Sequence, residues 1–226
     1  EALMESCNVA MMDISRTEGG QNFYKYQKVF GFGSKTAIDL PGEADTSGLV
    51  HTADNAGATD LATNSFGQNY NVTMVQVAAA YSSVVNGGAY YTPHVVKQIL
   101  NPNGSVIKNI EPELVRETVS AHTTAFINEA LRRTVAEGTG SAAAVAGYDV
   151  GGKTGTAQVV KNGKYTFDET IATYIGYGAR SETDYPEYVI MTKVWEDNRR
   201  LDGGMNAKPI FDEISQFMVN YLKMRR

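Results

Sequence analysis

Apolar residues recur with helical spacing along several stretches of this chain. They predict helices over residues 1–17, 22–32, 74–85, 121–137 and 206–222. Thr73 is a typical N-cap for the third of these, and Asn86-Gly87-Gly88 is a typical stop signal after it. In the last helix we expect a single apolar stripe made of Pro209, Ile210, Ile214, Phe217, Met218 and Tyr221.

Runs of β-branched and aromatic residues predict strands between and after these helices. Two short strands, near 94–100 and 105–109, are joined by Asn101-Pro-Asn-Gly104. Three longer strands are expected at roughly 150–160, 170–178 and 188–195. The Asn162-Gly163 loop and the polar turn Ala179–Pro186 are short enough to connect them as antiparallel hairpins.

This order of elements predicts an α+β fold, in which helices flank an antiparallel sheet. A length of 226 residues is enough to bury a full core, and we expect one domain over 1–226. The 206–222 helix should pack on the outer face of the sheet. After the turn at Pro41-Gly42, residues 44–70 are rich in Thr, Asn, Asp and Gly, and they predict a mobile loop near the functional site.

Composition excludes several classes of function. Twenty basic against 25 acidic residues give a net charge of −5, and no basic block suggests nucleic-acid binding. The single cysteine, Cys7, excludes an internal disulfide and any multi-cysteine metal site. No apolar run reaches the roughly 20 residues needed to cross a bilayer, and no signal peptide is visible. Because the chain does not begin with Met, we expect that an anchor, a signal or further domains precede it.

The segment Gly147–Thr156 fits two incompatible chemistries. Residues 147–154 satisfy G-x-x-x-x-G-K-[ST], the phosphate-binding loop of nucleotide hydrolases, whereas Lys153-Thr-Gly-Thr156 is an element of penicillin-recognising serine enzymes. A phosphate loop must follow a buried strand and open a helix. Here residues 141–146 are small and poor in strand formers, and the β-branched run 156–160 follows. The flanks therefore favour a strand, and a P-loop NTPase is the distant alternative.

A second short motif makes the lysine motif specific. Ser6-Cys7-Asn8 supplies a hydroxyl and a carboxamide two positions apart, which alone carries little information. Together with Lys153–Thr156 and further segments, it closely resembles the transpeptidase domain of class B penicillin-binding proteins, from Ser6 to the end of the chain. The further segments are Ile38-Asp-Leu-Pro-Gly-Glu43, Gly67-Gln-Asn-Tyr-Asn-Val-Thr-Met-Val-Gln-Val-Ala-Ala-Ala-Tyr81, Asn86-Gly-Gly88 and Thr139-Gly-Ser141.

The resemblance implies a role for each motif residue. Ser6 relays protons near the leaving group, Asn8 hydrogen-bonds the substrate amide, and Lys153 lowers the cost of proton transfer and attracts a carboxylate. Thr154 and Thr156 place hydroxyls on that carboxylate, because residues i and i+2 share one face of a strand. Gly155 permits close approach of the substrate, and the Thr156 amide is one of two oxyanion donors. No cofactor or metal is implied.

The nucleophile motif of this family, S-x-x-K, precedes S-x-N, and this chain starts too late to contain it. The one match, Ser105-Val-Ile-Lys108, follows a turn and enters a strand, where residues i and i+3 point to opposite faces. We therefore expect Ser105 to be a decoy and the fragment alone to be inactive. We also expect it not to form a stable monomer, since a missing N-terminal segment or a second chain must complete the fold.

The whole protein is then expected to be a peptidoglycan D,D-transpeptidase. The resemblance implies a bacterial enzyme held on the extracytoplasmic side of the cell membrane by an upstream anchor, acting on stem peptides in cell-wall synthesis. It also implies a β-lactam target. The alternative from another class is a β-lactam-sensing receptor domain, which shares the acylation machinery without turnover.

Overall fold

The structure is a computed structural model that describes residues 1–138, 147–181 and 185–224. The expected segment Thr139-Gly-Ser141 lies outside the described residues, and so does the middle of the expected turn 179–186. The described helices are α1 (Asn8–Glu18), α2 (Gly20–Val29), α3 (Ala58–Ser65), α4 (Met74–Val85), α5 (Ala121–Glu137) and α6 (Lys208–Tyr221), with a 3₁₀ turn η1 (Ser47–Leu49) and a π-helical turn η2 (Gly203–Ala207).

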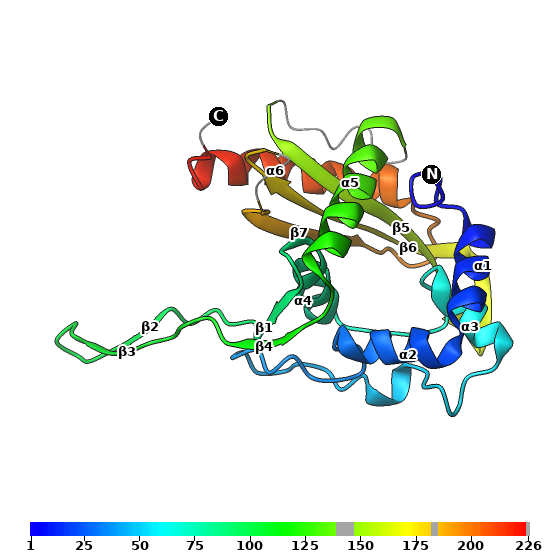
Figure 1. Ribbon diagram of the computed structural model, residues 1–226, viewed down its shortest axis with the longest axis horizontal. Coiled ribbons are helices and arrows are strands. Elements are labelled where there is room, and N and C mark those ends of the chain that lie inside the picture. The colour runs from blue at the N-terminus through cyan, green and yellow to red at the C-terminus, as the bar shows by residue number, and fades with distance from the viewer. Residues whose placement is uncertain (139–146, 182–184, 225–226) are drawn as a thin grey trace.

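The strands form one larger sheet and two small ribbons. They are β1 (Ala89–Tyr91), β2 (Gln98–Leu100), β3 (Val106–Asn109), β4 (Leu114–Glu117), β5 (Asp149–Lys161), β6 (Lys164–Ala179) and β7 (Tyr188–Val194). Strands β5, β6 and β7 pair antiparallel in that order, with Lys153 opposite Ile175 and Tyr174 opposite Thr192. The α+β fold with an antiparallel sheet and flanking helices is thus confirmed (Figure 1).

Helices cover both faces of the β5–β7 sheet, because successive strand residues point to opposite sides. On one face, Tyr177 packs with Val85 of α4 and Leu131 of α5. On the other face, the ring of Tyr174 lies 4.7 Å from that of Phe211 in α6. The predicted packing of the C-terminal helix on the sheet is confirmed.

The predicted apolar stripe is not the buried face of α6, which is displaced from it by about one residue. Ile210, Ile214, Phe217 and Tyr221 are exposed, and the buried side chains are Lys208, Phe211, Ser215 and Val219. Two of the buried residues are polar, and both have partners inside the protein. Lys208 lies 3.8 Å from Asp212, and the hydroxyl of Ser215 bonds that of Tyr188. Apolar periodicity could not find this face, because two of its members are polar: Lys208 pairs with Asp212 within the helix, and Ser215 bonds Tyr188 of β7.

Two other expectations need correction. Residues 44–70 are not one irregular loop, since they contain η1 and α3, and Asn64 of α3 is buried. The backbone N–H of Gly57 donates to the Asp60 carboxylate at 2.8 Å, which fixes the start of α3. The first helix begins only at Asn8, and a turn precedes it. By contrast, the Thr73 N-cap is confirmed, with its hydroxyl 3.1 Å from the N–H of Gln76.

The two ribbons form a long arm. Strands β1 and β4 pair next to the body, and β2 and β3 pair further out, so that the chain projects far beyond the helices (Figure 1). The hairpin expected around Asn101–Gly104 is therefore confirmed, while β1 and β4 were not predicted.

Candidate active site

Strand β5 carries the lysine motif on an open edge of the sheet. Within the described residues, β5 pairs only with β6, so half of its backbone N–H and C=O groups point away from the sheet. Lys153, Thr154 and Gly155 are half-buried, and Thr156 is exposed. The prediction of a strand at 150–160 is confirmed. The phosphate-loop interpretation of 147–154 is wrong, because Gly152, Lys153 and Thr154 lie inside a strand and open no helix.

The turn before α1 brings Ser6 to this strand. The Nζ atom of Lys153 lies 3.0 Å from Oγ of Ser6, across 147 positions of the sequence. The same amine donates to the backbone oxygen of Thr154 at 3.0 Å and to its hydroxyl at 3.1 Å. Ser6 has a positive φ of 54°, which is costly for a residue with a side chain and is typical of functional turns. The structure therefore joins the two motifs that the sequence separates.

A cavity of about 200 Å³ opens beside this contact. Its lining combines the predicted residues Ser6, Asn8, Lys153 and Thr154 with others from α1 and α3. Ser65 and Phe66 come from the segment that the sequence indicated as a loop, so their place in the lining was missed. An apolar wall next to a lysine amine is suited to exclude water from a reacting group. The lining residues are Leu3, Ser6, Asn8, Met11, Ser65, Phe66, Lys153 and Thr154.

The other end of the motif contacts the turn before α6. The hydroxyl of Thr156 accepts a hydrogen bond from the N–H of Gly203 at 3.1 Å and lies 3.4 Å from a carboxylate oxygen of Asp202. A side chain at position 203 would come within 2.5 Å of the Gly155 oxygen, so glycine is required for this approach. Asp202 and Gly203 carry no motif that the sequence analysis recognised, and only the fold brings them to β5.

Burial lowers the pKa of Lys153. Removal from water disfavours the ammonium form and lowers the pKa of Lys153 below its ordinary value of 10.5, while the negative charge of Asp202 opposes this shift. A lysine with a lowered pKa gives up its proton more readily. The amine is thus suited both to accept or pass a proton and to attract an anion.

The only S-x-x-K sequence is placed far from catalytic geometry. Ser105 lies at the tip of the β2–β3 hairpin, where its hydroxyl donates to the side chain of Asn103 at 2.8 Å. Lys108 lies in β3, and the two residues do not share a helical turn. The predicted position of this pair, a turn followed by a strand, is confirmed.

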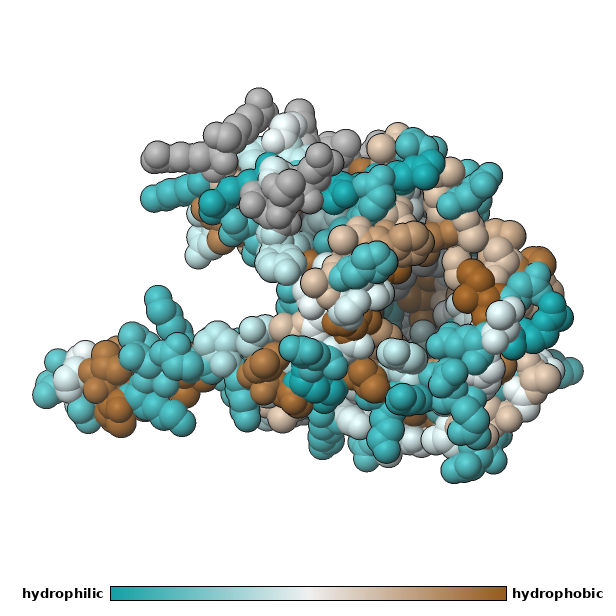
Figure 2. All heavy atoms as spheres, in the orientation of Figure 1, coloured by the Kyte–Doolittle hydropathy of each residue, from teal (hydrophilic) through white to brown (hydrophobic). Residues whose placement is uncertain are grey.

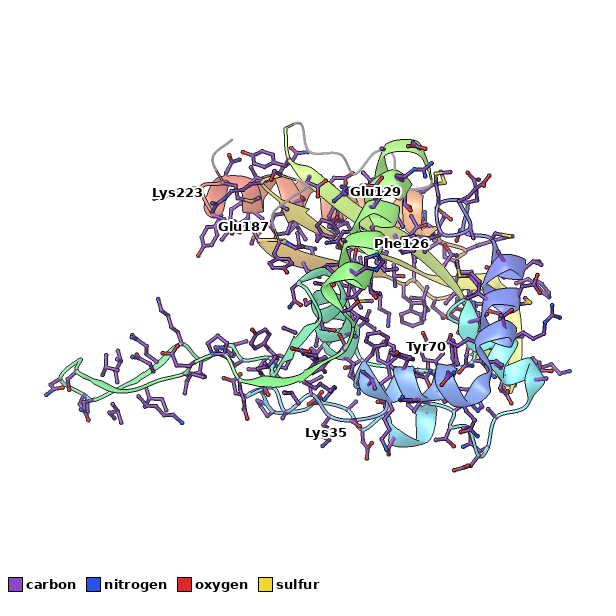
Figure 3. The ribbon with its side chains drawn as sticks, in the orientation of Figure 1. Lys35, Tyr70, Phe126, Glu129, Glu187 and Lys223 are labelled. Atoms are coloured by element: carbon purple, nitrogen blue, oxygen red, sulfur yellow. The ribbon has the colours of Figure 1, made fainter. Side chains whose placement is uncertain are left out.

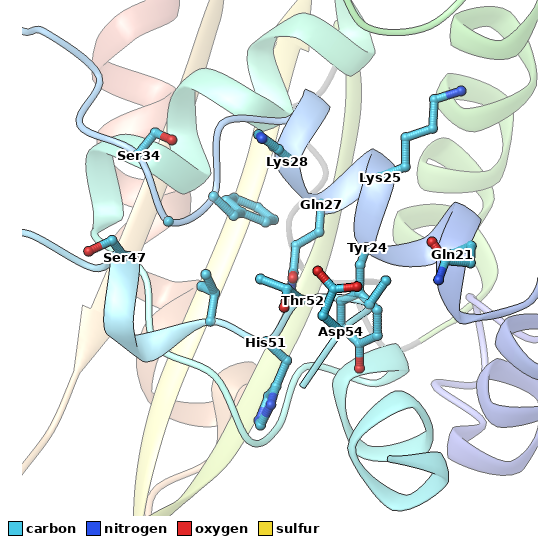
Figure 4. Close-up of a pocket in the computed structure, with 14 residues that line it drawn as sticks. Gln21, Tyr24, Lys25, Gln27, Lys28, Ser34, Ser47, His51, Thr52 and Asp54 are labelled. Atoms are coloured by element: carbon cyan, nitrogen blue, oxygen red, sulfur yellow. The ribbon is translucent and has the colours of Figure 1, made fainter. Parts of the chain in front are cut away.

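A second, larger cavity of about 490 Å³ lies between α2 and residues 47–54 (Figure 4). Tyr24, Gln27, Lys28, His51 and Asp54 line it, among others. None of the predicted site residues contributes to this cavity, so it has no part in the chemistry of the lysine motif.

Known proteins with similar sequences were found by comparison. Residues 1–216 match the family described as the penicillin binding protein transpeptidase domain. Stage V sporulation protein D of Bacillus subtilis is 39% identical over 216 residues, covering 95% of this chain and 33% of that protein. The probable peptidoglycan D,D-transpeptidase PenA of Neisseria flavescens is 30% identical over 222 residues, covering 97% of this chain and 52% of that protein.

The fold is also similar to solved structures. A crystal structure of penicillin-binding protein 3 from Mycobacterium tuberculosis, complexed with ampicillin, has a TM-score of 0.86 and 28% identity. That match covers 98% of this chain and 50% of the crystallised one. The chain therefore spans between about a third and a half of the length of these relatives.

Proposed function

The chain belongs to the penicillin-binding protein transpeptidase family, and from that membership we propose that it is part of a peptidoglycan D,D-transpeptidase. Residues 1–226 form the C-terminal portion of its transpeptidase domain. The enzyme transfers the acyl group of a stem peptide to a serine, releases D-alanine, and passes the acyl group to the amine of a second stem peptide. β-Lactams acylate the same serine.

The observation that carries this proposal is the contact between Lys153 and Ser6. An amine 3.0 Å from a hydroxyl, at the edge of a cavity that Asn8 also lines, is the arrangement needed for a proton relay to a leaving amine. Ser6 passes the proton, and the nearby amine of Lys153 lowers the cost of proton transfer at Ser6. The carboxamide of Asn8 hydrogen-bonds the substrate amide.

Substrate anchoring belongs to the rest of the β5 motif. The open edge of β5 offers backbone groups to an extended peptide, and Gly155 lets that peptide come close. The charge of Lys153 and the hydroxyls of Thr154 and Thr156 bind the terminal carboxylate of the stem peptide or of a β-lactam. The Thr156 hydroxyl accepts from the Gly203 N–H and donates to the Asp202 carboxylate at 3.4 Å, so its proton must turn from Asp202 to the bound carboxylate.

The acylated serine comes from outside residues 1–226 in this proposal. The one S-x-x-K of the chain sits in the β2–β3 hairpin and provides no nucleophile. The chain by itself is therefore inactive, and a preceding segment or another polypeptide supplies the serine and its lysine.

The site works on the outer side of the bacterial membrane, where stem peptides are cross-linked. Within the described residues, no helix combines the length and apolarity that a membrane crossing requires. We propose that an anchor in another part of the whole protein holds the domain at the membrane.

Labelling of the intact protein with fluorescent penicillin tests the role of Lys153. In Lys153→Arg the positive charge is kept, but a guanidinium does not release its proton near neutral pH. We expect the acylation rate to fall by about 100-fold or more, the usual effect of losing a general acid or base. Ser105→Ala is the matched control and should label at the wild-type rate.

Wild-type labelling of Lys153→Arg, or loss of labelling in Ser105→Ala, would contradict the proposal. Release of D-alanine from a lipid-linked peptidoglycan substrate then distinguishes a transpeptidase from a receptor. A protein that labels but does not turn over this substrate is a β-lactam sensor.

A further inference from the structure

The arm has no part in the proposed reaction. Its outer part, called the β2–β3 arm below, is a two-stranded antiparallel ribbon in which Gln98 pairs with Asn109, Ile99 with Lys108 and Leu100 with Val106. Among the described residues no third strand joins β2 or β3, so both edges of the ribbon carry unpaired backbone groups. Such edges are templates for another extended segment.

Aliphatic side chains cover this ribbon, although it has no core of its own. Ile99, Leu100, Val106 and Ile107 are between 45% and 59% exposed. Figure 2 shows apolar surface along the arm, and Figure 3 shows its side chains projecting into solvent on both sides. A two-stranded ribbon alone is marginally stable in water, so exposed aliphatic groups there indicate a surface that is covered in use.

The arm is held by another segment at its root, and the turn at its tip is ordered by its own hydrogen bonds. The carboxylate of Asp39 accepts hydrogen bonds from the N–H groups of Val95 at 2.8 Å and Val96 at 2.9 Å. At the tip, the side chain of Asn101 donates to the hydroxyl of Ser105 at 2.9 Å. A surface that is ordered before binding loses less conformational entropy on binding.

Charge restricts what covers the arm. Lys97 and Lys108 are exposed, and residues 95–110 contain no acidic residue, while the acidic Asp39 and Glu111 lie at the base of this ribbon. Pairing of two arms from two copies would bring like charges together. The tip residues 101–105 are polar, so insertion of the tip into a membrane would bury polar groups first. An acidic protein segment fits both the lysines and the aliphatic flanks.

We propose that the β2–β3 arm is a docking element for another protein, which adds an extended segment of alternating acidic and aliphatic residues to an open edge of the ribbon. Backbone hydrogen bonds hold the segment, the aliphatic side chains give contact area, and Lys97 and Lys108 select acidic partners. This interaction is independent of the acyl-transfer site.

Photocrosslinking in cells tests the proposal with the full-length protein. Benzoylphenylalanine replaces Ile107 in the arm or, as a control, exposed Asp168 in β6. We expect the arm position alone to crosslink another protein, at a segment rich in Asp, Glu and aliphatic residues. Adducts only with a second copy, only with lipid, with a basic segment, or with nothing at all would each overturn the proposal.

The purified partner then provides the quantitative test. The double variant Ile99→Ser, Ile107→Ser and the double variant Lys97→Glu, Lys108→Glu should each weaken binding at least tenfold. Lys164→Glu, an exposed charge reversal outside the arm, should not change binding. Thermal melts of all variants check folding, and a partner that binds every folded variant equally would overturn the proposal.

Discussion

Glu169 is a buried carboxylate in β6 that links the end of β5 to the segment just after β7. It lies 2.5 Å from the amine of Lys161 at the end of β5. It also accepts hydrogen bonds from the indole of Trp195 at 2.8 Å and from the N–H of Asn198 at 3.0 Å, both just beyond β7. The hydrogen bond from Lys161, followed by that from Asn198, lowers the pKa of Glu169 from 4.5 to about 2. The sequence analysis gave this residue no role.

This lowered pKa predicts a pH-dependent contribution to stability. A depressed folded-state pKa stabilises the protein fully above the ordinary value of 4.5, and the contribution is lost as pH falls towards about 2. Glu169→Gln should therefore lower the denaturation midpoint of the intact protein at pH 7, and the difference from wild type should shrink steadily below pH 4.5. Exposed Glu213→Gln is the control. A difference that stays constant from pH 7 to pH 2.5 would contradict this role.

At the scale of elements, the closeness of α6 to β6 depends on a missing side chain. A Cβ atom at Gly176 would lie 2.8 Å from the Phe211 ring and 2.9 Å from the Gly151 oxygen. Neither neighbour can move freely, since Phe211 is fully buried and the oxygen belongs to the sheet. The glycine therefore allows the ring of Phe211 to rest directly on the strand.

Gly176→Ala should destabilise the protein by about 1–3 kcal/mol, the usual cost of overpacking a core. Urea denaturation of the intact protein measures this cost. Gly48→Ala is the matched control, because no atom lies within 4 Å of the added carbon, and its effect should stay within about 0.5 kcal/mol. Equal stability of the two variants would show that α6 can shift away from the sheet without cost.

At the scale of the whole molecule, the described residues leave apolar surfaces uncovered. Along α6, Ile210, Ile214, Phe217 and Tyr221 are exposed at helical spacing, and the last two rings stack at 5.6 Å. Figure 2 shows a hollow with apolar side chains at its rim, between the α1–α3 side and the sheet. Beside α2 lies a cavity of about 350 Å³ with five aromatic side chains in its wall: Phe23, Tyr26, Phe30, Phe32 and Tyr70.

These surfaces predict that residues 1–226 alone do not behave as a stable monomer. Burying a large apolar side chain contributes about 1.5–3 kcal/mol, and a domain has only about 5–15 kcal/mol in total. Sedimentation of the isolated chain should show association that grows with concentration. Replacing Ile214 and Phe217 by serine should reduce that association. A monomeric chain with a cooperative melt that is independent of concentration would contradict the prediction.

The sequence alone determined most of the elements, because local signals control them. The Thr73 cap, the stop at Asn86–Gly88 and the Asn162-Gly163 turn act over a few residues, and the structure has α4 and the β5–β6 hairpin where they indicate. Prediction from the sequence failed where partners distant in sequence decide which residues are buried or which segment is helical. The buried face of α6 includes Ser215, whose hydroxyl bonds that of Tyr188 in β7, 27 positions away. Helix α3, which was not predicted, lies in a segment whose composition is typical of loops.

For the site, too, the sequence indicated some residues and only the tertiary structure showed the others. The resemblance carried by the Ser6–Asn8 and Lys153–Thr156 motifs implied Ser6, Asn8 and Lys153 as site residues, and a serine, a carboxamide and a lysine are groups that acyl transfer needs. Only the tertiary structure brings the lysine amine 3.0 Å from the serine hydroxyl, and only it adds Asp202, Gly203 and Phe66 around the motif. Contacts between residues 147 positions apart depend on the path of the whole backbone, which no local pattern records.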